Sequence, residues 1–499
     1  MFTDEQRISL WDQIRQRDLR QFAGLLPVTL LKQAAADAGA AMGRGALNLV
    51  TLTWLSLSSA FHRGHNFAGV LMVVMKLLKD VGQWPLSQTG HRRRPRSSRR
   101  RGTGGRAGRH RRKSPRNKHD PHGNGKDLSE EAFVQARGKM PAGFWIALIL
   151  LLGEAFQRQH GELARYQGLR LLALDGTTIN LPIWRRLREY FGVARNGKGP
   201  RRAQARLVML QLPLVRLPLC YELTALIEGE RTVAARLLSR VQPEDLVLMD
   251  KGFWSYGLFQ QIQQRQAFFA VRLMRGISLK TVRRLGYQDR LVRWTPSDQR
   301  WKKQGLPPGM ELRVIDYQVK GFRPSAIVTN LLCPQRLSRE QWLGLAASDA
   351  AGRRLDEGLY HQRWQIETTF CEIKVRQGME GSLRGRTPQT IAYEVAGHML
   401  LYLLIRWLMV EAALEHGEKP LALSFLNALR ELQDLSPPLL LADARRVQRV
   451  LLPQLLRRIA SHRVPPRPGR HYPRPGDTKV RYNGAGKRML PSKLMVNET

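Results

Sequence analysis

Three carboxylates in separate parts of the sequence are suited to bind divalent metal ions together. Asp175 follows the apolar run Leu171 to Leu174, which predicts a buried strand. Asp250 follows a similar run, Leu246 to Met249, and Glu367 lies in a later stretch that predicts a helix. Magnesium prefers oxygen ligands, and a few carboxylates with substrate phosphate oxygens suffice to hold it. Two such ions about 4 Å apart would stabilise the attacking and leaving oxygens of a phosphodiester cleavage, without a histidine general base.

The stretch around Glu367, residues 356 to 377, has no Gly or Pro after Gly358 and predicts a helix of about five turns. Four of its side chains fall within roughly 60° of one another at about 100° per residue. They stand at offsets of 0, 3, 7 and 14 in the order Tyr360, Arg363, Glu367 and Lys374. Taken alone, such a face is typical of a solvated helix surface with spaced charge pairs.

The same spacing resembles the YREK motif of the DDE transposases of the insertion-sequence-four family. Two further segments resemble that family, namely LDGTTINLP around Asp175 and LMDKGFWS around Asp250. With the LRGRTP segment that follows the helix, the resemblance extends over roughly residues 168 to 412. An aspartate before glycine is often a turn former, and Asp250 would also suit a helix cap. The segments around Asp175, Asp250 and Glu367 occur in the family's order. This favours a role in the site, rather than in a turn or a helix cap, for the two aspartates.

The resemblance implies that Asp175, Asp250 and Glu367 are the catalytic triad and the ligands of two Mg²⁺ ions, for which Mn²⁺ can substitute. It implies that the other members of the motif contact DNA phosphates, and these are Tyr360, Arg363 and Lys374. The implied partner is double-stranded DNA, both transposon ends and target, bound by a homodimer in a synaptic complex. Two rival carboxylates, Asp316 and Glu394, lie in other predicted elements and rank below the triad.

The composition points to a polyanionic partner. The 499 residues carry a formal charge of +42, and 43% of them are hydrophobic, which is enough for several globular domains. A signal peptide is not expected at the N-terminus, and the longest apolar runs contain charges or prolines that disfavour membrane spans. The three cysteines form no CxxC pair, which fits a reducing bacterial cytoplasm and no zinc site.

The order of apolar runs from Gly168 onward is three strands, helix, strand, helix and strand, as in an RNase H-like α/β domain with a mixed sheet and flanking helices. An all-α region precedes it, and a mostly β insertion interrupts it before the Glu367 helix.

Residues 91 to 126 form an Arg-rich segment. It carries 12 Arg and 3 Lys against one Asp, so we expect it to be disordered and to contact DNA nonspecifically. The predicted regions are a helical DNA-binding region 1–90, the Arg-rich insertion 91–126, its helical continuation 127–166, the catalytic domain 167–275 and 335–415, the β insertion 276–334, and a helical C-terminal region with a basic tail 416–499.

The sequence therefore predicts a transposase of a bacterial insertion sequence that cuts and pastes DNA between terminal inverted repeats. One alternative is an RNase H-like nuclease without strand transfer. Another is a basic DNA-binding protein, derived from a transposase, whose site is inactive. An intact set of three carboxylates disfavours the second alternative.

Overall fold

The computed structural model describes most of the chain from residue 25 to residue 465. The predictions for the Arg-rich insertion 91–126 and for the tail beyond residue 465 lie outside the described residues. The ranges described are 25–43, 47–61, 130–193, 202–297, 300–303, 305–318, 324–345, 348, 355, 358–434 and 446–465.

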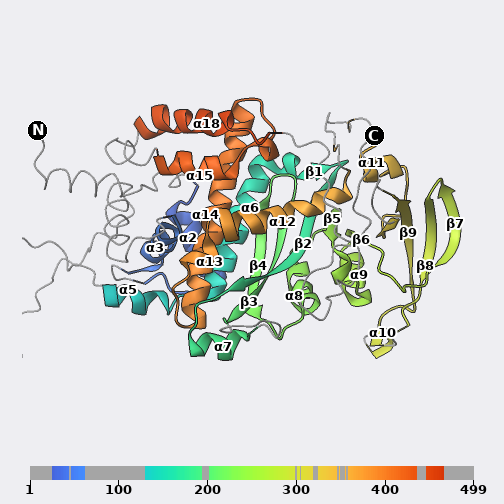
Figure 1. Cartoon of the computed structure of the whole chain (residues 1–499), viewed down its shortest axis with the longest axis horizontal. Helices are drawn as coiled ribbons and strands as arrows, with labels where there is room; N and C mark the ends of the chain where they lie inside the picture. The colour runs from blue at the N-terminus through green and yellow to red at the C-terminus, as the bar shows by residue number, and fades with distance from the viewer. Residues whose placement is uncertain are drawn as a thin grey trace, which may run out of the picture.

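A mixed sheet runs through the centre of the described chain, with helices on both of its sides (Figure 1). This confirms the α/β class predicted from the sequence. The strand order is β4-β3-β2-β5-β6-β10-β9-β8-β7, and β1 pairs with β2. β5 runs parallel to β2 and β6, whereas the other neighbours are antiparallel. The strands are β1 Arg165–Tyr166, β2 Leu169–Asn180, β3 Gln204–Leu212, β4 Leu217–Ala225, β5 Asp245–Met249, β6 Phe268–Arg272, β7 Lys280–Gly286, β8 Asp289–Trp294, β9 Met310–Tyr317 and β10 Ser325–Thr329.

Strand β2 continues well beyond the apolar run that predicted it. The prediction that Asp175 ends its strand is therefore wrong, because β2 pairs with β3 as far as Asn180. The burial of β2 falls from Asp175 onward, so the hydrophobic signal stops although the backbone pairing does not. The ladder between β2 and β5, by contrast, stops at the pair Leu174 and Met249. Asp175 and Asp250 are thus the next residues on two adjacent parallel strands.

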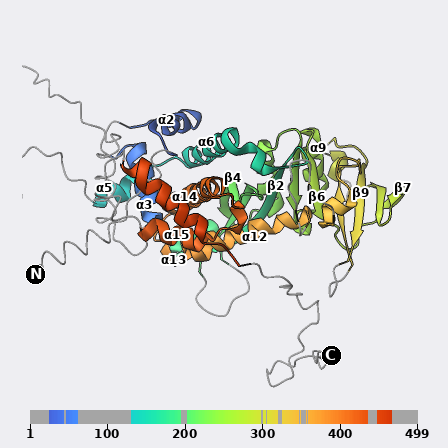
Figure 2. The ribbon, with the colours of Figure 1, turned by 90° about the horizontal axis from the view of Figure 1, so that it is seen from above.

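The strands of the predicted β insertion extend the same sheet, because β10 pairs with β6. The sequence indicated β9 and β10, whereas β7 and β8 were not predicted. All but one residue of β7 are exposed, so the strand lacks the alternation that marks a half-buried one. Figure 2 shows these strands at one end of the molecule, with α12 along one side of the sheet and α6 and α9 along the other.

The helices include a long central one, α14, that is buried around most of its circumference. It contacts α3, α6, α18 and β4, so it forms the middle of the hydrophobic core. The α-helices are α2 Val28–Asp37, α3 Leu49–Phe61, α5 Glu130–Arg137, α6 Ala142–His160, α7 Arg185–Phe191, α8 Glu230–Leu237, α9 Tyr256–Gln264, α10 Arg300–Lys303, α11 Arg339–Leu343, α12 Trp364–Cys371, α13 Met379–Ser382, α14 Pro388–Glu415, α15 Phe425–Asp434 and α18 Leu452–Ser461.

Helix α14 is long and apolar enough to cross a membrane by length and composition, but 94% of its most apolar window is buried inside the fold. The bent pair of α5 and α6 passes the same test only if it counts as one span. A glycine lets α14 approach α3 closely, since a Cβ on Gly397 would lie 2.5 Å from the Ser56 carbonyl oxygen. Threonine 387 caps the start of α14 through the Thr390 backbone N–H, and Pro388 occupies the first turn.

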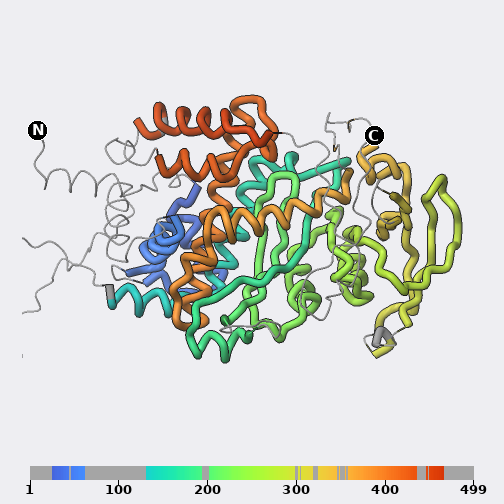
Figure 3. The backbone as a smooth tube through the Cα atoms, in the orientation of Figure 1, coloured from blue at the N-terminus to red at the C-terminus, as the bar shows by residue number. Residues whose placement is uncertain are grey.

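The stretch that predicted one regular helix over 356–377 is helical in three successive forms. A 3₁₀ segment, Tyr360–Arg363, leads into α12, and a π-helical segment, Glu372–Arg376, follows it. The described helical path begins after Gly358, which has a φ of 87°. A Cβ at that position would lie 2.6 Å from the Trp342 carbonyl oxygen, so the backbone turns there rather than coiling. Figure 3 traces this path across the sheet and into α13.

Candidate active site

The strand register and α12 bring the three predicted carboxylates to one side of the sheet. Asp175 and Asp250 stand next to each other, where β5 ends beside β2. Helix α12 packs on β2, and one nitrogen of Arg363, Nη1, lies 3.6 Å from Asp175 Oδ2 and 3.0 Å from Glu367 Oε1. Asp250 lies farther from cations, since Arg272 approaches its Oδ1 only to 4.0 Å. The structure thus gathers Asp175, Asp250, Glu367 and Arg363.

The carboxyl group of Asp175 has a raised pKa in this arrangement. Burial raises the pKa of its carboxyl to about 6, and the negative charges of Glu367 and Asp250 act in the same direction. The Gly176 backbone N–H, 2.8 Å from Oδ1, and the Arg363 guanidinium lower the pKa but do not offset the burial. Crowding of carboxylates around a half-desolvated acid is a pattern found at functional sites, where a cation or a proton balances the charge.

The donor set of the site fits a hard divalent cation. Asp175, Asp250 and Glu367 supply only carboxylate oxygens, which are the ligands that Mg²⁺ prefers. A bound cation would offset both the burial of the Asp175 carboxylate, which is the main cause of its raised pKa, and the smaller repulsion from its two acidic neighbours. Within the described ranges, no three His, Cys, Asp or Glu side chains lie close enough together to hold a metal ion as they stand. Arg363 lies between two of the three carboxylates.

The interpretation of this helix face as a solvated surface is wrong for its first two members. The Arg363 side chain is only 4% exposed and its guanidinium lies 4.5 Å from the centre of the Trp364 ring. Tyr360 is also buried, and its hydroxyl donates a hydrogen bond of 2.9 Å to the Met249 carbonyl oxygen. Burial raises the pKa of Tyr360 far above its usual value. The tyrosine therefore ties the helix to the end of β5, directly before Asp250.

Lys374 lies farther along β2 than the other members of the motif. Its Nζ donates to the Thr178 carbonyl oxygen at 2.7 Å and lies 3.2 Å from Glu380 Oε1. Glu380 in turn accepts from the Asn180 backbone N–H at 3.2 Å. The structure thus places Lys374 beside the half of β2 that extends past β5, three residues beyond Asp175.

The two rival carboxylates have partners of their own outside this cluster. Asp316, on β9, forms an ion pair with Arg290 of β8. Glu394, on α14, accepts from Arg137 at 2.9 Å and from the backbone N–H groups of Arg384 and Gly385. Burial raises the pKa of Glu394, against these stabilising contacts. Its role is to join α5, the loop before α14 and α14 itself.

Sequence reasoning missed a buried charge cluster at the far end of the same helix. Glu372 accepts from Arg216 at 3.0 Å, from the Tyr402 hydroxyl at 2.7 Å and from Arg406 at 2.6 Å. Arg216 lies in the turn between β3 and β4, and Arg406 lies in α14, 156 and 34 residues away in sequence. The available signal was the single arginine inside the apolar stretch of α14, because a buried charge needs a partner.

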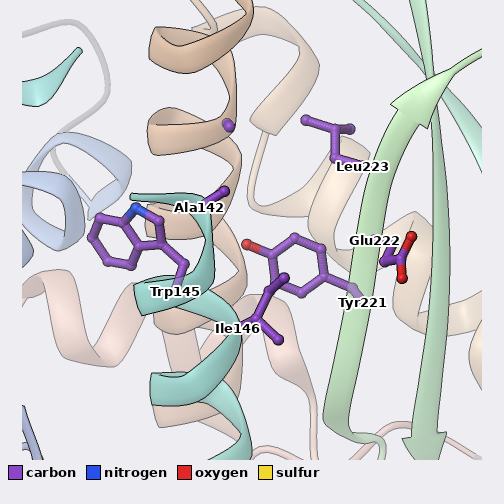
Figure 4. A pocket seen from close by; sticks show the side chains of 7 residues that line it. Ala142, Trp145, Ile146, Tyr221, Glu222 and Leu223 are labelled. Carbon is purple, nitrogen blue, oxygen red and sulfur yellow. The ribbon is translucent and has the colours of Figure 1, made fainter. Parts of the chain in front are cut away.

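A small pocket lies away from the carboxylates, between α6, β4 and α14 (Figure 4). Its volume is about 190 Å³, and the Tyr221 ring projects into it from β4 toward α6. None of its lining residues belongs to the motif or to the carboxylate cluster. They are Ala142, Trp145, Ile146, Tyr221, Glu222, Leu223 and Ala392.

Comparisons with known proteins converge on one kind of domain. Residues 166–404 match the family model described as "Transposase DDE domain". The chain is 28% identical, over 263 residues, to the transposase InsG for insertion sequence element IS4 of Escherichia coli (strain K12), covering 49% of this chain and 53% of that protein. The chain thus spans about half the length of the curated relative it matches. Among solved structures, a piggyBac transposase synaptic complex with hairpin DNA matches 60% of this chain and 58% of its own, at 11% identity and a TM-score of 0.31, which is too low to support an argument.

Proposed function

We propose that this chain is a DDE transposase, as the match of residues 166–404 to that family model and the similarity to the transposase of insertion sequence IS4 suggest, and that it cuts and joins DNA at the ends of an insertion sequence. The single observation that carries the proposal is the convergence of Asp175, Asp250 and Glu367 on one side of the sheet, beside Arg363. The reaction is hydrolysis of a phosphodiester at each element end, followed by attack of the freed 3′-hydroxyl on target DNA.

We propose that Asp175, Asp250 and Glu367 hold two Mg²⁺ ions, or Mn²⁺ in their place. When bound, these ions activate the attacking oxygen and stabilise the leaving one. The raised pKa of Asp175 supports this role, because a carboxyl crowded by other acids gains most from a nearby cation. Cation binding keeps Asp175 ionised at neutral pH, and the carboxylate then serves as an oxygen ligand.

The three other residues of the motif have different proposed tasks. Arg363 turns its planar guanidinium toward the scissile phosphate, where two parallel N–H groups bind two oxygens. Lys374, beside Thr178, provides a point charge for a neighbouring phosphate. Tyr360 was predicted to contact phosphate, but its hydroxyl is already bonded to Met249. We therefore propose that Tyr360 sets the position of the helix relative to Asp250.

At the level of the fold, we propose that β2 to β6 with α8, α9 and α12 form an RNase H-like core. The parallel β2, β5 and β6, with β3 and β4 antiparallel at one edge, support this assignment. The proposed DNA partner is double-stranded, and two copies of the chain would pair two element ends in one synaptic complex. The formal charge of +42 favours such a polyanionic partner, and action on DNA places the protein in the bacterial cytoplasm.

The test uses DNA that contains the boundaries of the element encoding this reading frame. Glu367→Gln should reduce single-turnover cleavage by at least about 1000-fold, the equivalent of roughly 4 kcal/mol, since metal ligands act as a unit. Binding to the same DNA in calcium should change less than about twofold, because the phosphate contacts remain. Asp316→Asn is the matched control, since it removes a carboxylate that is paired with Arg290 away from the site.

Near-normal cleavage by Glu367→Gln in magnesium would contradict the assignment of the site. Cleavage without any joined product, when target DNA is supplied, would instead favour the nuclease without strand transfer. Absence of cleavage by the unmodified protein on every boundary fragment would favour the inactive DNA-binding protein.

A further inference from the structure

A second surface of the chain combines exposed aromatic rings with unpaired arginines, at the end of β2. Three large apolar side chains are exposed within eight residues there, with exposed fractions of 59% for Ile183, 43% for Trp184 and 60% for Tyr190. Isolated exposed apolar residues are common, but a cluster of large ones marks an interaction site. Leu187 and Phe191 anchor α7 in the core. The Tyr190 ring contacts the Phe191 ring, with 4.8 Å between the ring centres, and still remains 60% exposed.

The same segment is strongly cationic. Arg185 is paired with Glu189 one turn later, whereas Arg186 and Arg188 are exposed, and no ion pair within the described part of the chain involves either. From the loop between α13 and α14, the Arg386 guanidinium lies 4.6 Å from the centre of the Trp184 ring. We name this set the Trp184 surface and define it as Trp184, Arg186, Arg188, Tyr190 and Arg386.

The Trp184 surface is joined to the proposed site by a continuous strand. Asp175 lies five residues before Asn180, the last residue of β2, and a strand rises about 3.3 Å per residue, so the two are roughly 17 Å apart. Lys374 contacts β2 at Thr178, between these two points. Figure 1 shows α7 at the end of β2 and β3, below α13. The distance corresponds to about five nucleotides at about 3.4 Å each along one DNA strand.

We propose that the Trp184 surface is a second DNA contact that holds the duplex about five or more base pairs from the cleaved phosphate; the proposal rests on the proposed function. Arginines paired with exposed aromatic rings suit DNA because the guanidinium binds phosphate oxygens while the flat rings contact sugars and bases. Charge complementarity selects this partner, since the surface carries three arginines, and the acidic residue of the same segment, Glu189, is paired with Arg185. Such a surface repels other basic chains and attracts a polyanion.

The proposal predicts that the contribution of this surface depends on DNA length. Arg186→Ala combined with Arg188→Ala is introduced into the non-cleaving Glu367→Gln protein. Dissociation constants are then measured for element-end duplexes that extend 2, 5, 10 or 15 base pairs past the cut, truncated first on one side and then on the other. The double variant should bind the long duplexes roughly tenfold more weakly and should lower the salt slope by about two.

On one side of the cut, this binding defect should disappear once the duplex ends within about four base pairs of the cut, because the DNA then no longer reaches the Trp184 surface. The matched control is Arg449→Ala combined with Arg457→Ala, which removes the same charge from exposed positions near α18. Melting temperatures should be unchanged in both double variants. Tyr190→Ala tests the aromatic part and should weaken binding of the same long duplexes severalfold, whereas Tyr190→Phe should not.

A defect of equal size on the shortest duplexes, or one no larger than that of the control, would overturn the assignment of this surface and leave the proposed function intact. If the parent Glu367→Gln protein bound no element-end DNA at any length, both proposals would fall together. The two failures are therefore distinguishable in one set of measurements.

Discussion

Two glutamates on one continuous helical path, Glu367 and Glu372, have opposite surroundings. Glu372 is buried and both of its oxygens are occupied, Oε1 by Arg216 and Oε2 by Tyr402 and Arg406. Burial alone would raise the pKa of Glu372, but the two arginines and the tyrosine hydroxyl hold that pKa below its usual value. Glu367, about one turn earlier, is 36% exposed and contacts one nitrogen of Arg363.

The two clusters differ in how their carboxylate charges are balanced. The Glu372 cluster stabilises the fold, whereas the Asp175 cluster is suited to bind a cation. In the Glu372 cluster, two cations and a hydroxyl surround one carboxylate, so the charges are satisfied within the protein. In the Asp175 cluster, Arg363 is the cation that lies within 4 Å of both Asp175 and Glu367. Burial, with smaller contributions from the charges of Glu367 and Asp250, raises the pKa of Asp175 to about 6. A site that keeps excess negative charge near its surface is prepared for a cation from solution, whereas a satisfied one has no need of it.

The largest expected effect is the loss of the satisfied cluster. Glu372→Gln should lower the free energy of unfolding by about 3–5 kcal/mol, because it leaves Arg406, which is 1% exposed, without a counter-charge. Glu367→Gln, the matched change at an exposed position, should cost at most about 1 kcal/mol. Urea unfolding of the two variants checks the contrast. Equal stabilities would mean that the buried cluster does not anchor the helix.

The next effect belongs to Arg363 and should appear in chemistry rather than in folding. A misplaced scissile phosphate costs on the order of 100-fold in rate, so Arg363→Ala should reduce single-turnover cleavage by about that factor. Arg363→Lys should restore only part of the rate, since it keeps the charge and loses the planar fork. Thermal melts of the same preparations provide the control. Normal cleavage by Arg363→Ala would mean that this residue is structural, like Arg406.

The smallest effect is a pH dependence of stability at Asp175. Its folded-state pKa, about 6, exceeds the ordinary value of 3.8, so the folded state binds the proton more tightly than the unfolded state. The stabilisation is complete below about pH 4 and is lost as pH rises through 6. Asp175→Asn should therefore melt higher than the unmodified protein at pH 7.5 without divalent cations, and equally at pH 4.

Adding magnesium should reduce that difference at pH 7.5, because a bound cation stabilises the ionised carboxylate. Differential scanning calorimetry at the two pH values, with and without the metal, measures all four conditions. A higher melting point for Asp175→Asn at pH 4 alone would contradict the sign of this pKa shift.

The sequence predicted the order of the strands because each apolar run is short and bounded by clear breaks. It also predicted that Asp175 and Asp250 would each follow an apolar run. It could not show that Asp175 lies inside a strand, since the extension to Asn180 is held by pairing with β3 rather than by burial. A hydrophobic pattern in the sequence indicates which side chains are buried. It cannot predict backbone pairing in a part of a strand whose side chains are not buried.

The sequence predicted which residues lie in the candidate site, but not which atoms their side chains contact. Spacing placed Tyr360 and Arg363 on one helix face, but gave no sign that the tyrosine hydroxyl would reach the Met249 carbonyl of another strand. The partners of Glu372 were equally hidden, because residues 156 and 34 positions away meet only after folding. The spacing argument also assumed a regular helix, whereas the turn over Glu372–Arg376 is a wider π turn, a form that recurs at functional sites.

The end of β2 has a consequence for solubility. Beyond the last pair with β5, no strand among the described residues pairs with this edge of β2. Such edges template intermolecular pairing and aggregation. Here two side chains occupy that edge, since Lys374 binds the Thr178 carbonyl and Glu380 binds the Asn180 amide. A pair of residues beside the proposed site thereby also hinders the pairing of this strand with a strand of another molecule.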